Sequence, residues 1–104
     1  MDSWKVALPL AGWDQASVWG WDLPEGSLFA QLYRNGDDGG AEPRIWLTTL
    51  KGWPQVTAPQ VLAEWIANVT AVSLPDVLLA LAAQAPGEMA GELREDAAYL
   101  AAMR

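Results

Sequence analysis

The segment SVWGWDLPEGSLFAQLYRNG, residues 17–36, has the pattern of two β-strands joined by a turn. Residues 17–22 and 27–34 are rich in aromatic and aliphatic side chains, as strands usually are. Between them, residues 23–26 contain Pro and Gly, which favour turns, and Asn35-Gly36 is a strong hairpin dipeptide. We therefore predict an antiparallel hairpin at the centre of the fold.

Two further segments extend this hairpin into a meander. Residues 4–8 form a short apolar run that ends before Pro9, and residues 44–49, RIWLTT, follow a polar loop at residues 37–42. Strands that are neighbours in the sequence usually pair with each other. The first half of the chain, residues 1–50, is thus predicted to be an antiparallel β-meander of three or four strands.

The second half, residues 57–103, carries the signals of helices. Thr57-Ala58-Pro59-Gln60 and Ser73-Leu74-Pro75-Asp76 share a hydroxyl N-cap, an early proline and a side-chain acceptor three residues on. The second helix, which extends to about Gln84, is apolar nearly all round, and a third helix covers residues 86–102. The stripe that the first helix is expected to bury consists of Val61, Leu62, Trp65, Ile66 and Val69.

Together the two halves predict one domain, residues 1–104, with an α+β fold in two layers. A chain of 104 residues is too short for two independent cores. We expect the meander to be followed by three helices packed on one face of the sheet, because a sheet buries its apolar face against a second layer. Cysteine is absent, so disulfide bonds contribute nothing.

Seven tryptophans in so short a chain must lie in the core or at an interface. If like residues of adjacent strands share a face, the sheet has an aliphatic face beneath the helices and an aromatic face opposite. The predicted aromatic face consists of Trp19, Trp21, Phe29, Tyr33 and Trp46, with Arg34 and Arg44 at its rim. Because one helical layer covers only one face, we predict that the aromatic face binds another protein chain, with a homodimer as the leading hypothesis. The alternatives are an ordinary core and a tryptophan platform for a sugar or a cation.

Charge and composition exclude several classes of function. The net charge of -7, from 13 acidic and 6 basic residues, argues against direct nucleic-acid binding and against adhesion to an anionic membrane. Histidine is absent as well as cysteine, so the commonest general base and the thiol nucleophile are missing. The glycines form no phosphate-binding motif, and Asp37-Asp38 lacks the spacing of a calcium loop. We expect a non-catalytic protein without a cofactor or a bound metal.

Residues 67–77, ANVTAVSLPDV, resemble the turn of a helix-turn-helix. Bacterial repressors commonly have Ala, then Gly, Val-Ser and Val where this chain has Ala67, Ala71, Val72-Ser73 and Val77. The resemblance implies DNA binding, but the helix that would read DNA contains neither Lys nor Arg. It therefore supports a different alternative, a transcription-related regulator whose acidic surface acts as an anti-repressor or a DNA mimic.

The N-terminal residues lack the pattern of a secretion signal, because Lys5 is the only early positive charge and Pro9 interrupts the apolar run. No stretch approaches the roughly 20 apolar residues that a membrane span needs. We expect a cytoplasmic protein, and its abundant alanine and glycine suggest GC-rich coding and a bacterial source.

Overall fold

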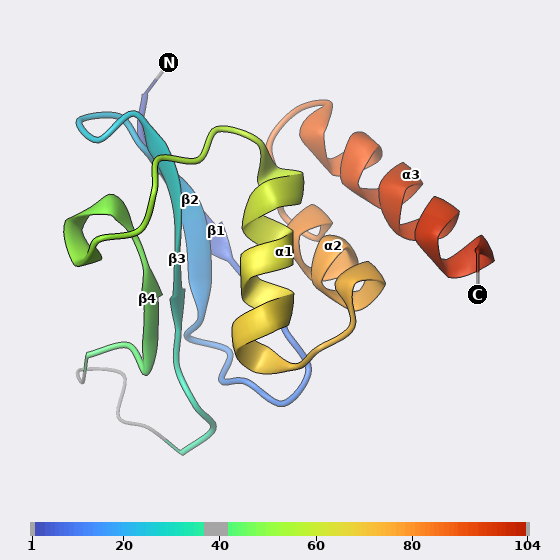
Figure 1. Cartoon of the computed structure of the whole chain (residues 1–104), viewed down its shortest axis with the longest axis horizontal. Coiled ribbons are helices and arrows are strands. Elements are labelled where there is room, and N and C mark those ends of the chain that lie inside the picture. The colour runs from blue at the N-terminus through green and yellow to red at the C-terminus, as the bar shows by residue number, and fades with distance from the viewer. Residues whose placement is uncertain (1, 37–41, 104) are drawn as a thin grey trace.

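The computed structural model describes residues 2–36 and 42–103. In these ranges the chain forms four strands, one 3₁₀ turn and three α-helices. In chain order these are β1 (Trp4–Ala7), β2 (Val18–Asp22), β3 (Ser27–Leu32), β4 (Ile45–Leu47), η1 (Thr49–Lys51), α1 (Pro59–Thr70), α2 (Leu74–Ala82) and α3 (Met89–Ala102). The helices all lie on one side of the sheet, so the predicted two-layer α+β fold is confirmed (Figure 1). Most of the predicted polar loop, with Asp37 and Asp38, lies outside the described residues.

The strands form an antiparallel sheet in the order β1-β2-β3-β4. Its central hairpin closes where Asp22 pairs with Ser27 across the connection at residues 23–26. That connection is a β-turn in which the Gly26 N–H donates to the Leu23 carbonyl oxygen at 3.0 Å. Gly26 has a φ of 61°, a backbone conformation that glycine adopts without steric cost.

The prediction that Trp19 and Trp21 share a face with Phe29 and Tyr33 is wrong. An even number of residues in the connection pairs the odd-numbered residues of β2 with the even-numbered residues of β3. Trp21 therefore lies opposite Leu28, and Trp19 lies opposite Ala30. Side chains opposite each other share a face, so both indoles belong to the aliphatic side that faces the helices.

Between β3 and β4 the faces match as predicted. Leu32 pairs with Ile45 on the helix side, and Gln31 pairs with Trp46 on the other side. The register of β1 places Trp4 beside Trp21 and Val6 beside Trp19. The helix side of the sheet therefore carries a mixed layer of indole rings and aliphatic chains.

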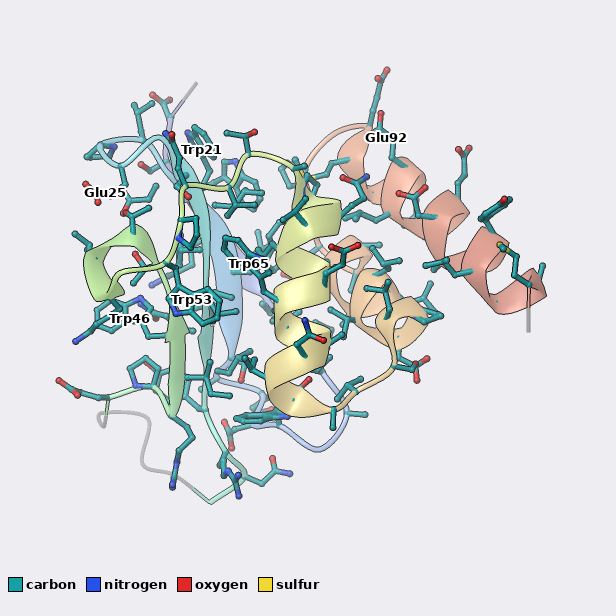
Figure 2. The ribbon with its side chains drawn as sticks, viewed as in Figure 1. Trp21, Glu25, Trp46, Trp53, Trp65 and Glu92 are labelled. Atoms are coloured by element: carbon teal, nitrogen blue, oxygen red, sulfur yellow. The ribbon has the colours of Figure 1, made fainter. Side chains whose placement is uncertain are left out.

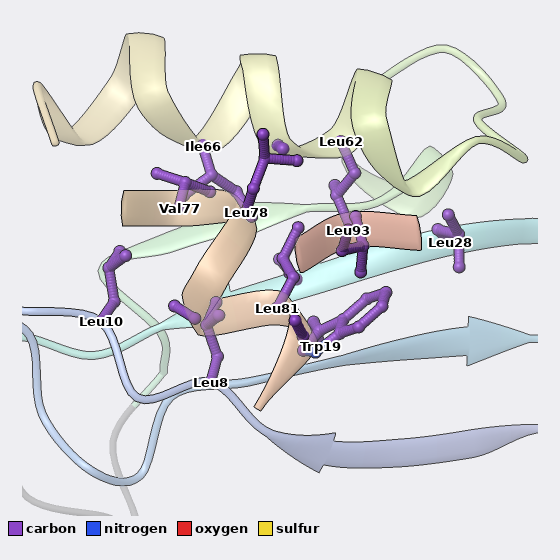
Figure 3. Close-up of a cluster of buried hydrophobic side chains, with 14 of the residues drawn as sticks. Leu8, Leu10, Trp19, Leu28, Leu62, Ile66, Val77, Leu78, Leu81 and Leu93 are labelled. Carbon is purple, nitrogen blue, oxygen red and sulfur yellow. The ribbon is translucent and has the colours of Figure 1, made fainter. Parts of the chain in front are cut away.

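Trp19 is the largest fully buried side chain and is 0% exposed (Figure 3). The Trp4 ring meets it edge-on, with ring centroids 5.0 Å apart and an interplanar angle of 83°. The other large side chains with almost no exposure are Leu8, Leu32, Leu47, Leu62, Ile66, Leu81 and Leu93. Since burial of one such aliphatic side chain contributes about 1.5–3 kcal/mol, this layer supplies most of the driving force for folding.

A short hydrogen-bonded crossing joins the sheet to the helical layer. The Leu28 N–H donates to the Val56 carbonyl oxygen at 2.8 Å, and the Val56 N–H donates to the buried Ser27 hydroxyl oxygen at 2.9 Å. These bonds hold the segment after η1 across the start of β3. The helix α1 then begins at Pro59, on the side of the sheet where the Trp19 ring lies.

The helix starts agree only in part with the predicted caps. Ser73 caps α2, because its hydroxyl oxygen accepts from the Asp76 N–H at 3.3 Å. In α1, however, the N-cap is Ala58 and no side chain caps it, so the predicted hydroxyl cap at Thr57 is wrong. Pro59 opens this helix and has no N–H, which leaves one fewer donor to satisfy.

The buried stripe of α1 is narrower than predicted. Leu62 and Ile66 are buried and Trp65 is half-buried, but Val61 and Val69 are 39% and 38% exposed. The two valines lie at the edges of the predicted stripe, beyond the reach of the sheet and of α2. The helix α1 therefore packs against the rest of the protein through one narrow side.

The helix α2 lies between α1 and α3 (Figure 1), which explains why its sequence is apolar nearly all round. Leu79 is the exception on this helix, with 50% exposure. The third helix packs on α2 and begins at Met89 instead of residue 86. Gly87, with a φ of 60°, interrupts the chain before it.

Gly20 sits where the backbone of β1 comes closest to β2. A Cβ atom at this position would lie 2.0 Å from the Trp4 carbonyl oxygen, so the strands would have to separate. We expect Gly20→Ala to lower the free energy of unfolding by about 3 kcal/mol, measured by urea denaturation. Gly91→Ala in α3, where nothing lies within 4 Å, should raise it by about 0.5–1 kcal/mol. Equal midpoints for Gly20→Ala and the wild type would contradict the close approach.

Ala71, which ends α1, is the one non-glycine residue with a positive φ, 61°, in the described part of the chain. A side chain in this left-handed region costs about 1–2 kcal/mol, whereas glycine avoids that cost. We expect Ala71→Gly to stabilise the protein by about 0.5–1 kcal/mol in the same assay. Ala83→Gly is the control: Ala83 is right-handed at the end of α2, so the same change should destabilise.

Candidate functional site

The residues of the predicted aromatic face are divided between the two sides of the sheet. Trp19 and Trp21 face the helices, so they do not belong to the surface on which Phe29 lies. Trp46 points away from α1 on the far side of β4, as Figure 2 shows. We call the side without helices the open face. Its strand residues are Lys5, Ala7, Val18, Gly20, Asp22, the buried Ser27, Phe29, Gln31 and Trp46.

The open face is built of rows that cross the strands. Val18, Gln31 and Trp46 are aligned in one row over β2, β3 and β4, and Phe29 lies in the next row opposite Gly20. Gly20 has no side chain, and the β1 backbone at Trp4 and Lys5 occupies the place where its Cβ would lie. The larger members of both rows are only half-buried, so apolar area remains exposed on this side.

The Lys51 ammonium partly covers Trp46, with its Nζ atom 5.2 Å from the ring centroid. Lys51 belongs to η1, whose N-cap Thr48 accepts from the Leu50 N–H at 3.3 Å. The capped turn thus holds a cation beside the ring, an arrangement worth about 0.5–1 kcal/mol at an exposed site. It also sets one border of the open face.

Charge is distributed unequally over the two layers. On the open face, Lys5 and Asp22 flank a shallow hollow that Phe29 also lines, so both signs are present there. In the helical half, residues 57–103, Arg94 is the single cation. The acids of that half are Glu64, Asp76, Glu88, Glu92, Glu95 and Asp96. The negative excess is therefore greater on the helical layer than on the open face.

Two of the predicted rim residues lie at the end of the sheet where β3 leaves and β4 begins. The guanidinium of Arg34 lies 5.7 Å from the Trp13 ring centroid, and Arg34 and Trp13 also form an isolated β-bridge. The Tyr33 carbonyl oxygen accepts from the Asp14 N–H at 2.8 Å in the same region. Arg44 is exposed just before β4. Arg34 thus binds the β1–β2 connection to the sheet.

On the helix side, Trp4 and Trp21 form one wall of an apolar pocket of about 590 Å³. The pocket lies between this end of the sheet, the start of α1 and the start of α3. Sequence reasoning missed it because its walls come from segments far apart in the chain. The repeated tryptophans were the one available signal, but Trp21 was predicted on the opposite face and Trp4 was assigned to neither face.

The helix-turn-helix-like corner forms between α1 and α2, with the turn at residues 71–73. Its second helix is mostly buried between neighbours, and Asp76 and Leu79 are its exposed side chains. Neither of them provides the positive charge or the amide group that reads a base edge. The corner packs α1 against α2.

Within the described residues, no group of three or more acidic side chains is placed to hold a metal ion. The same part of the chain contains no helix with the length and apolarity that crossing a membrane requires.

No protein-family model, curated protein or solved structure matches this chain.

Trp19 and Trp46 lie on different sides of the sheet, so their replacement by alanine should lower the free energy of unfolding by different amounts. We expect Trp19→Ala to lower the free energy of unfolding by roughly 3–5 kcal/mol, because it leaves a large cavity in the core. Trp46→Ala should cost about 1–2 kcal/mol, since the ring is half-buried on the open face. Urea denaturation of both variants measures the difference. Equal losses would contradict the assignment of the two rings to different sides of the sheet.

Proposed function

We propose that this protein is a non-catalytic interaction module that associates with a second copy of itself through the open face. One observation carries the proposal: α1, α2 and α3 cover one side of the sheet, while Val18, Phe29 and Trp46 stay half-exposed on the other. Tryptophan and other aromatic residues are enriched in the centres of protein interfaces. The anchors are now Phe29 and Trp46, without the two tryptophans of β2.

Charge supports a second copy as the occupant. In a two-fold symmetric interface the same patch meets itself, so a surface with both signs can complement its own copy. The open face has this property, because Lys5 and Asp22 lie on it together. Contacts between two helical layers would instead bring acidic surfaces together and be repulsive.

Mass in solution tests the proposal directly. Light scattering after size exclusion, at two protein concentrations tenfold apart, should give a mass near twice 11.2 kDa at the higher concentration. A mass of 11.2 kDa at both concentrations would overturn self-association.

A charge reversal identifies the surface that is used. We expect Lys5→Glu to weaken the dimer about tenfold or more, because each interface contains the changed residue twice and now places like charges together. Arg94→Glu on α3 makes the same change in net charge at an exposed site of the helical layer, so its dimer should be unaffected. Sedimentation equilibrium of the two variants measures both constants. Equal weakening by Lys5→Glu and Arg94→Glu would point to a general charge effect and contradict the open face as the interface.

A further inference from the structure

The apolar pocket on the helix side has the size of a ligand site. Its volume of about 590 Å³ falls inside the range of roughly 300–1,000 Å³ that small-molecule sites occupy. Trp4 and Trp21, which are register partners at adjacent positions of β1 and β2, form one wall. Leu28 of β3, Pro59 of α1 and Met89 of α3 also line the pocket.

The pocket exists because α3 does not rest on the sheet. This helix packs against α2 and lies farthest from the strands, as Figure 1 shows. The turn at Gly87 brings its first residues over the end of the sheet, but their side chains do not fill the space there. Trp4, Trp21 and Met89 remain half-buried as a result.

The chemistry of the walls defines the ligand. Among the described residues that line the pocket, Glu92 is the only one with a charge, and Thr57 is the only other one with a polar side chain. Glu92 is exposed, and it lies toward the same end of the molecule as Trp21 (Figure 2). The site therefore combines an apolar interior with a carboxylate at its rim.

We propose that this pocket binds a small organic ammonium ion that carries an apolar group. The apolar group would occupy the space between the indoles and Met89, where its transfer from water is favourable. The ammonium would lie near the Glu92 carboxylate and the tryptophan rings, because tryptophan is the aromatic residue that attracts cations most strongly. No described lining residue is basic, and the net charge of -7 favours the approach of a cation over that of an anion.

The pocket opens on the helix side of the sheet, and Trp46 belongs only to the open face. Trp4 and Trp21 line both this pocket and the hollow that Lys5, Asp22 and Phe29 border, so the two sites are neighbours at this end of the sheet. The two proposals have different readouts, the mass in solution and saturable binding of a ligand, so loss of self-association alone leaves this inference standing.

Titrations of the full chain with three probes test the proposal. The probes are benzyltrimethylammonium, its neutral isostere neopentylbenzene, and the anion phenylacetate. We expect the cation to shift the indole N–H resonances of Trp4 and Trp21 saturably in a nitrogen–proton correlation spectrum, while that of Trp46 stays in place. The neutral isostere should bind at least fivefold more weakly than the cation, and the anion should not bind.

A matched pair of variants tests the role of the carboxylate. We expect Glu92→Gln to weaken binding of the cation about fivefold to tenfold. Glu95→Gln removes a carboxylate from the same helix at an exposed position that does not line the pocket, so binding should be unchanged. Both positions are exposed, so both variants should fold.

Other results overturn the proposal. The absence of a saturable shift of Trp4 and Trp21 with benzyltrimethylammonium at millimolar concentration would exclude this pocket as the site. Equal binding of the cation and the neutral isostere, or of the wild type and Glu92→Gln, would contradict recognition of the ammonium group.

Discussion

The pairing of Asp22 with Ser27 is the constraint on which the rest of the structure depends. It fixes which residues of β2 lie opposite which residues of β3, and a shift by one residue would exchange the two faces of the strand. With this register Trp19 becomes the centre of the core, and Trp21 becomes a wall of the pocket. The open face retains fewer rings for the same reason. One turn thus decides where the hydrophobic effect acts and which surfaces remain to bind something else.

The strands and helices were predictable because their signals are local. Gly26 and the Ser73 cap mark the boundaries of elements in the sequence itself. The face on which Trp19 lies was predicted wrongly, because like side chains were matched across β2 and β3, whereas the four residues of the connection at 23–26 set the pairing. The pocket was harder still, since Trp4 and Met89 meet only after the helical layer has docked. Local chemistry defined the elements, but long-range packing defined the site.

The indole rings on the helix side of the sheet stabilise the fold by the area they bury and not by hydrogen bonds. In the described part of the chain, the Nε1 atoms of Trp19 and Trp21 are buried without an acceptor. An unpaired buried donor costs about 1–3 kcal/mol, so the area that each ring buries must offset that cost. Trp46 differs from them, because its ring contacts the Lys51 ammonium at the border of the open face. The same residue type therefore fills volume on one side of the sheet and presents a surface on the other.

The order of the elements has a consequence during synthesis. The sheet precedes every helix that covers it, so Trp19 and its neighbours leave the ribosome while their cover is still being translated. At about 5–20 residues per second, the helical half takes roughly 2–10 seconds to follow. Throughout that interval the nascent strands present an uncovered apolar layer and open edges, which are the features that lead chains to aggregate. For this protein, we expect the demand on chaperones to be concentrated in the time between synthesis of the fourth strand and completion of the helical half.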